Sequence, residues 1–354
     1  MLQSTYYEVA SRLERIDFGS IWPGFSPGPF ALYQETLACL DGQIIPRPSE
    51  FRGNTAITWQ GHPLAIWNLE EGSQDLDLLA SSLVHELFHA YQNLCGETRF
   101  PHDIRLALSP TSPAELASRG QEGQLLAQAV ASGPQEARKH LAAFCALRRQ
   151  RWESPACRQE CLAETVEGTA EFAGLRALSM LSPETYRAEL DRYRALLLQP
   201  GPLLTDARRM AYYTGALLLL SAQEAGLELR HPLSNQSQPL FSFLDRLLPP
   251  TPPPPLRAEA LQEAAALAGQ EDRAHRQAVA QFLEQAPPYR KGPFRICGYD
   301  PMNQFAVDGK LFCTQFLALQ DPKTGSILSL PGRSLLILSA GSAEMAEGVY
   351  HPAH

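Results

Sequence analysis

Two histidines four residues apart, with a glutamate directly after the first, form the part of this sequence best suited to catalysis. They are His85, Glu86 and His89, within the stretch SSLVHELFHAYQ at residues 81–92. In a helix, residues i and i+4 lie on the same side. Two neutral imidazoles can then offer Nε2 to one ion, and the carboxylate beside the first can reach a water at an open coordination position. The pattern therefore predicts half of a catalytic zinc site.

The surrounding residues predict a helix over residues 74–95 whose leucines and histidines face opposite ways. On a helical wheel the histidines share a side with Ser81, Ser82 and Gln92, whereas most leucines and alanines gather opposite. A histidine that only fills a core would be expected among the leucines. We therefore expect this helix to pack through its leucine face and to present both histidines to a cleft.

A third ligand is needed, and a row of glutamates lies downstream. These residues are Glu160, Glu164, Glu167 and Glu171. Their spacings of three and four place them along one face of a helix predicted within residues 160–178. By itself such a row is typical of a solvated acidic face. An ion with two positive charges, bound by neutral histidines, gives a physical reason to turn these carboxylates inward.

The two motifs together resemble the zinc-binding helices of the gluzincin metallopeptidases. HELFH followed well downstream by EGTAEF is similar to that superfamily, and EG-x-A-E-F is especially similar to the glutamate helix of bacterial collagenases. Related EG-x-A forms occur in zinc aminopeptidases. The resemblance implies that Glu167 is the third zinc ligand, on a helix antiparallel to the first. The long segment between His89 and Glu167 is then a helical insertion.

The resemblance also implies a supporting role for Glu171, because thermolysin-like members place an acidic residue there that hydrogen-bonds a liganding histidine. That role has an independent reason, since a liganding imidazole needs its other N–H held by a carboxylate or a carbonyl. Glu164 competes with Glu167 and Glu171 for either position, and Glu171 is itself an alternative third ligand. The sequence leaves this choice open.

In this interpretation the reaction is hydrolysis of a peptide or amide bond. Zinc lowers the pKa of a bound water and polarises the substrate carbonyl. Glu86 acts as the general base, taking the proton of the water and returning it to the leaving amine. Two other functions stay open: a catalytically silent metal-binding scaffold or interaction protein, and a zinc hydrolase of a non-peptide amide. Glu86 favours an enzyme, because a structural metal site needs no such carboxylate.

A hydrogen-bond donor to the oxyanion would complete the site. The candidates are Tyr212, Tyr213 and His231, and we select Tyr213 as the catalytic residue. Arg99 and His102 follow the zinc helix closely and are expected to border the cleft.

The whole chain predicts an α+β protein with a mostly helical, zincin-like catalytic core, a small N-terminal sheet and a β-rich C-terminal subdomain. A first helix is expected over residues 2–18, and a strand pair within residues 54–69 could offer an edge to an extended peptide substrate. The predicted domains are 1–73 for the N-terminal helix and sheet, 74–247 for the catalytic region, 248–256 for a proline-rich linker, 257–285 for an amphipathic helix and 286–354 for the C-terminal subdomain.

Composition narrows the partners and the compartment. The chain has 354 residues, of which 44% are hydrophobic, so it can bury a sizeable core. A net charge of −8, with both signs interspersed, argues against nucleic acid or an anionic membrane as a partner. The first residues do not resemble a signal peptide, and seven scattered cysteines fit reduced thiols. We therefore expect a cytoplasmic Zn²⁺ enzyme with a peptide or protein substrate, in an oligomeric state that the sequence does not determine.

Overall fold

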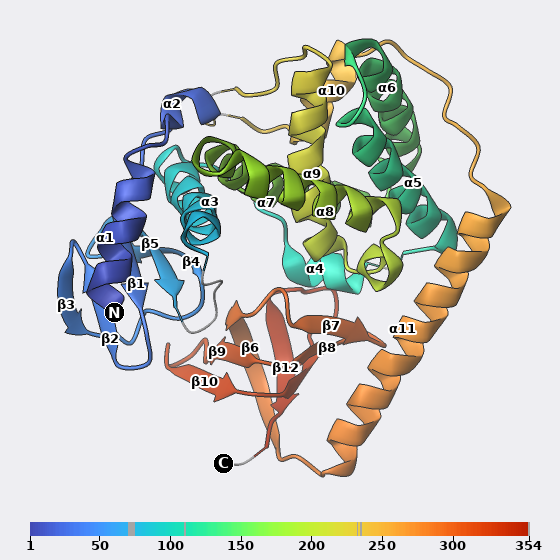
Figure 1. Ribbon diagram of the computed structural model, residues 1–354. Coiled ribbons are helices and arrows are strands. Elements are labelled where there is room, and N and C mark those ends of the chain that lie inside the picture. Colours follow the sequence, from blue (N-terminus) through green and yellow to red (C-terminus); the bar gives the residue numbers. More distant parts are fainter. Residues whose placement is uncertain (70–74, 110, 232, 234–235, 353–354) are drawn as a thin grey trace.

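The computed structural model describes residues 1–69, 75–109, 111–231, 233 and 236–352. It shows an α+β fold with a helical core, one sheet from the N-terminal part of the chain and a second sheet from the C-terminal part (Figure 1). The predicted fold class is confirmed in these respects. The predicted boundary between residues 73 and 74, and the last two residues, lie outside the described residues. Across the described residues, every helix is too short or too polar to cross a membrane.

The N-terminal region is a five-stranded sheet in the order β3-β2-β1-β5-β4, in which β4 is an edge strand. Its elements are α1 (Leu2–Leu13), α2 (Phe18–Ile21), β1 (Phe30–Tyr33), β2 (Leu37–Leu40), β3 (Gln43–Pro46), β4 (Thr55–Trp59) and β5 (His62–Asn68). The strand pair predicted within residues 54–69 is confirmed as the antiparallel β4–β5 hairpin. The first helix is shorter than the predicted 2–18, because Asp17 caps the separate helix α2 by accepting a hydrogen bond from the Ser20 N–H.

Nine helical segments follow in the described part of the chain and make the helical core. They are α3 (Leu76–Leu94), α4 (Asp103–Leu108), α5 (Pro113–Ala129), α6 (Pro134–Arg151), α7 (Pro155–Leu181), α8 (Pro183–Leu198), η1 (Gly201–Leu204), α9 (Ala207–Glu224) and α10 (Leu240–Leu247). Helices α5 to α8 each carry a proline in the first turn. Proline suits that position because its fixed φ is helical and its missing N–H has no partner there in any case.

Two glycines of α7 allow its neighbours to approach closely. A Cβ atom on Gly174 would lie under 3.0 Å from the carbonyl oxygen of Ser81 in α3, and one on Gly168 would lie under 3.0 Å from the Cα of Gly215 in α9. The Ser81 hydroxyl also donates a 2.9 Å hydrogen bond to the carbonyl of Gly174. Helix α7 is therefore pressed against α3 and α9, and this brings the glutamate helix to the histidine helix.

The C-terminal part is a seven-stranded antiparallel sheet in the order β10-β9-β6-β12-β11-β8-β7. Its elements are β6 (Tyr289–Tyr299), β7 (Gln304–Val307), β8 (Lys310–Cys313), β9 (Phe316–Gln320), β10 (Ile327–Pro331), β11 (Ser334–Leu338) and β12 (Met345–Tyr350). The proline-rich residues 248–256 form no helix or strand and lead into α11 (Ala258–Glu284). Helix α11 runs as a long rod from α5 to this sheet (Figure 1).

Two clusters of buried apolar side chains attach the C-terminal sheet to helices α11 and α4. Phe282 of α11 packs with Phe312 and Leu335, whereas Ile104 of α4 packs with Leu311 and other buried side chains of the sheet. Helix α4 thus joins the C-terminal sheet to the helical core.

Candidate metal centre

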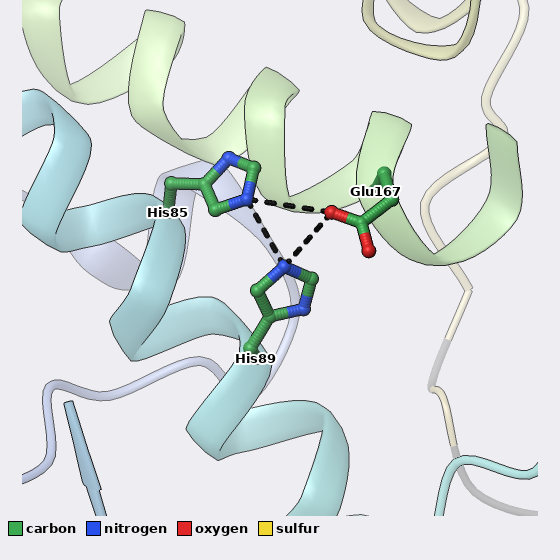
Figure 2. Close-up of side chains that lie close together, drawn as sticks. All are labelled: His85, His89 and Glu167. Atoms are coloured by element: carbon green, nitrogen blue, oxygen red, sulfur yellow. Dashed lines mark hydrogen bonds and ion pairs between the residues drawn. The ribbon is translucent and has the colours of Figure 1, made fainter. Parts of the chain in front are cut away.

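His85, His89 and Glu167 converge on one point, as Figure 2 shows. The two Nε2 atoms are 3.0 Å apart, and Oε2 of Glu167 lies 3.6 Å from Nε2 of His85 and 3.2 Å from Nε2 of His89. A tetrahedral site with bonds of about 2.0–2.1 Å separates its donor atoms by about 3.3–3.4 Å. The three donors therefore have the spacing of ligands to a single ion, and this buried group could bind a metal.

The convergence follows from antiparallel packing of α3 and α7. Residue numbers fall along α7 as they rise along α3, and the contacting pairs are Ser81 with Gly174, His85 with Glu171, His89 with Glu167, and Gln92 with Val166. Helix α3 is buried on most of its sides. This corrects the expected single packed face: the histidine side contacts α7, while Leu94, placed on the leucine side, is 68% exposed.

Hydrogen bonds fix which nitrogen of His85 faces the common point. Its Nδ1 lies 2.8 Å from Oε2 of Glu171, and the Tyr193 hydroxyl donates to the other oxygen of that carboxylate. An ionised carboxylate accepts only, so Nδ1 carries a proton and Nε2 is the nitrogen that faces the common point, where it can bind an ion once it is deprotonated. Glu171 thus occupies the supporting position that the resemblance implied.

His89 is oriented in the same way, by a residue that the sequence did not single out. Its Nδ1 lies 2.7 Å from Oε1 of Gln92, whose Nε2 donates to the Val166 carbonyl and the Thr169 hydroxyl, at 2.9 Å each. Those two acceptors set the amide orientation, so Oε1 accepts from the imidazole. The position of Gln92 on the histidine side of the wheel was the only signal for this role.

Glu164 lies outside the cluster. Its carboxylate accepts hydrogen bonds of 2.7 and 2.9 Å from Arg148 of α6 and one of 2.8 Å from the Thr214 hydroxyl of α9. This corrects the expectation that Glu164 competes for a place beside the histidines, because a buried arginine already binds both of its oxygens.

The electrostatics of the centre favour an added positive charge. Burial raises the pKa of Glu167, but His89, His85 and Arg208 together hold that pKa well below its usual value. Burial lowers the pKa of His85, yet Glu167 and Glu171 raise it well above the ordinary range. The site thus stabilises a cation, either a proton or a metal ion.

Glu86 and a cavity of about 260 Å³ lie beside the triad. Glu86 is 8% exposed and lines this cavity together with His85 and apolar side chains from β5, α3 and α7. Burial raises the pKa of Glu86, and the two histidines oppose that shift in part. A carboxylate with a raised pKa is a stronger base, so its chemistry suits proton abstraction.

Tyr212, and not Tyr213, faces the centre. The Tyr212 ring stacks on His85 with centroids 5.6 Å apart and planes at 6°, and it lines the cavity. Tyr213 packs edge-on against Tyr193 at 4.8 Å and lies outside the cavity wall. This corrects the choice of Tyr213, because successive helical residues point about 100° apart and only one of the pair can face His85. Burial and Glu167 raise the pKa of Tyr212, so its hydroxyl keeps its proton.

The remaining candidates lie elsewhere. Arg99 and His231 line a separate cavity of about 10 Å³, where Arg99 pairs with Glu97 at 2.5 Å. His102 precedes α4, and its backbone N–H donates a 2.6 Å hydrogen bond to Gln159.

A second residue missing from the sequence-based site is Arg208, at the start of α9. Its Nη2 donates a 2.6 Å hydrogen bond to Oε1 of Glu167, the oxygen turned away from the histidines. The signal available was its position one helical turn before Tyr212.

Comparisons of the chain with protein-family models, with curated proteins and with solved structures found no match. The chemistry of the centre must therefore be argued from its own side chains. Two imidazole nitrogens and one carboxylate oxygen are a donor set typical of catalytic zinc, which uses three protein ligands and leaves a further position open.

Proposed function

We propose that this protein is a zinc-dependent hydrolase that cleaves peptide bonds at a site of the gluzincin type. The observation that carries the proposal is the convergence of two Nε2 atoms and one carboxylate oxygen next to a cavity that His85 and Glu86 line. A structural zinc site is closed by four protein ligands. The three-donor cluster and the buried carboxylate at its side favour an enzyme over a silent scaffold.

Each residue has a distinct task in this proposal. Zinc, when bound, supplies a Lewis acid that polarises a carbonyl and acidifies a water. Glu86 accepts the proton of that water and passes it to the leaving amine. Tyr212 donates a hydrogen bond to the oxygen that gains negative charge. Glu171 and Gln92 keep the imidazoles of His85 and His89 in place.

The walls of the cavity suggest which substrates bind. Trp67, Leu78, Leu175 and Leu178 give it apolar sides next to Glu86 and His85. A large apolar side chain beside the cleaved bond would be removed from water there, at about 25 cal/mol for each Å² buried. Strand β4, at the edge of a sheet that packs on α3, offers backbone groups to an extended peptide. We also propose that the substrates are cytoplasmic peptides.

The test is a digest of a peptide library by purified protein of known zinc content. We expect about one equivalent of zinc and cleavage next to large apolar residues. Glu86→Gln should keep the zinc and lose about 10²- to 10⁴-fold in turnover, because it removes the general base. The matched control is Glu136→Gln, which changes an exposed glutamate that pairs with Lys139.

Full activity of Glu86→Gln would remove Glu86 from its assigned role. Protein that neither contains zinc nor binds it at micromolar concentration would refute the metal site itself.

A further inference from the structure

We propose that Arg208 is a positioning residue for the ligand Glu167, and that the C-terminal sheet holds Arg208 in place through Asp103 of α4. The inference rests on the metal site of the proposed function and not on the choice of peptide as substrate.

The two carboxylate oxygens of Glu167 have different partners. Oε1 accepts the 2.6 Å hydrogen bond from Nη2 of Arg208, whereas Oε2 faces Nε2 of His85 and of His89. The guanidinium thus occupies one oxygen and leaves the other for an ion. Arg208 is on α9, which crosses α7 at the close approach of Gly168 and Gly215, so little freedom remains in the distance between the two helices.

Asp103 forms an ion pair with a second nitrogen of the same guanidinium. Its Oδ1 lies 3.1 Å from Nε of Arg208, and the two side chains are 15% and 13% exposed. Arg208 therefore pairs with two carboxylates, the partly buried Asp103 and the buried Glu167. The formal charges of these three groups sum to −1 + 1 − 1 = −1, so the arginine does not leave the ligand side of the centre with excess positive charge.

The C-terminal sheet anchors the helix that carries Asp103. Ile104, the next residue, is 1% exposed and packs in the core of the sheet with Leu311 and Leu336. Asp103 is the first residue of α4, which packs on the sheet as well as on α7 and α9, so the sheet helps to fix the position of Asp103. A chain of contacts thus leads from the sheet through Asp103 and Arg208 to Glu167.

The physical consequence concerns the way in which Glu167 binds. A carboxylate with one oxygen held by a guanidinium binds an ion preferentially through the other, which leaves more coordination positions for water and substrate. Metal affinity is a poor measure of this effect, because the charge of the guanidinium repels an ion while its hydrogen bond orients the ligand. The coordination of the ion is the informative quantity.

The experiment uses Co²⁺ in place of zinc, because the visible absorption of Co²⁺ reports its coordination. We compare the wild type with Arg208→Met, Arg208→Lys and the matched control Arg209→Met. Arg209 also ties α9 to the C-terminal part, through a 2.9 Å hydrogen bond to the Met302 carbonyl, but it does not contact Glu167. We expect Arg208→Met to change the spectrum and to lower kcat by about 10- to 100-fold with little change in KM.

Arg208→Lys should recover part of the wild-type spectrum, because lysine keeps one charged donor, and Arg209→Met should match the wild type. Asp103→Asn should shift the spectrum in the same direction as Arg208→Met but by less. Adding Asp103→Asn to Arg208→Met should then change nothing further, because Asp103 acts through Arg208.

A wild-type spectrum in folded Arg208→Met overturns the proposal, and so does an equal change in Arg209→Met, which would indicate a general loosening of α9. If Arg208→Met does not fold, Arg208→Lys and Asp103→Asn decide by the same measurement, and a wild-type spectrum in both is the overturning result. Wild-type protein that binds Co²⁺ but cleaves no peptide refutes the proposed hydrolase, while the spectra still decide the role of Arg208.

Discussion

The two halves of the glutamate row on α7 lie on one helical face but have different partners. Glu160 and Glu164 bind buried arginines, whereas Glu167 and Glu171 bind the histidines of α3. The residue type and spacing are the same in both halves. The difference is which helix packs against each half.

The first half belongs to a buried ionic network with balanced charge. Its members are Arg119, Glu122, Arg148, Arg151, Glu160 and Glu164. Three arginines and three glutamates give 3 − 3 = 0, and Glu122 and Arg148 at its centre are 0% and 1% exposed. Burial alone would raise the pKa of Glu160, but Arg119 and Arg151 hold that pKa well below its usual value. Every carboxylate of this half is already satisfied.

The second half has no such balance. The histidines are neutral unless they gain a proton, and Arg208 is shared between Glu167 and Asp103. With neutral imidazoles, Glu167 and Glu171 together carry more negative charge than the shared Arg208 offsets, and they raise the pKa of His85, so this half gains from an added cation, a proton or a metal ion. The comparison teaches that a buried charge network serves structure where it is complete and can serve ligand binding where it lacks a cation.

The sharpest test of the comparison is Glu167→Gln. It should remove bound zinc and lower turnover by more than about 10³-fold, because a neutral amide is a poor ligand for zinc. The free energy of unfolding of the metal-free protein should fall by less than in Glu164→Gln, because Arg208 keeps Asp103 as a partner. Zinc content and peptide cleavage are the measurements, and a Glu167→Gln variant that holds zinc as the wild type does would break the assignment.

The converse change is Glu164→Gln on the same helix. We expect it to lower the free energy of unfolding by about 3–5 kcal/mol, because it removes one partner of a buried ion pair and leaves Arg148 undercompensated. Urea denaturation of the metal-free protein measures this loss. The folded variant should still bind one zinc. Loss of the metal without loss of stability would show that Glu164 belongs to the metal site and not to a separate ionic network.

Acid should lower the stability that the buried ionic network around Glu160 and Glu164 contributes. Glu122 and Glu160 have folded-state pKa values below the unfolded value, so their contribution is present above about pH 4.3 and is lost as the pH falls through the folded values. Two such carboxylates give a slope of at most about 2.7 kcal/mol per pH unit. Denaturation of metal-free protein at pH 5, 4 and 3 checks this, and a flat profile would contradict it.

The smallest effect is expected at Glu171. Glu171→Gln should weaken zinc binding by about 10- to 100-fold, because the hydrogen bond that orients His85 loses its charge. Competition with a chelator measures the affinity. Glu189→Gln is the matched control, since Glu189 lines the same cavity and pairs with Arg192 rather than with a histidine. Equal losses in both variants would argue against a specific role for Glu171.

Much of the fold could be predicted because its signals are local. The proline-started helices, the β4–β5 hairpin and the strands of the C-terminal part follow from turn residues and from the period of apolar side chains. The segment between α3 and α7 could only be described as a helical insertion. In the structure, its helices α5 and α6 provide the other members of the ionic network, Arg119, Glu122, Arg148 and Arg151. The arginines pair with Glu160 and Glu164, which form one half of the glutamate row.

The sequence by itself determined the histidine pair and the common face of the glutamates, because helical geometry places residues three and four apart side by side whatever surrounds them. Only the tertiary structure decided that Glu164 binds Arg148, that Glu167 meets the histidines and that Tyr212 rather than Tyr213 faces His85. Those choices depend on which helices meet and how closely. The glycines at positions 168 and 174 let backbones touch, and that contact joins segments that no local spacing connects.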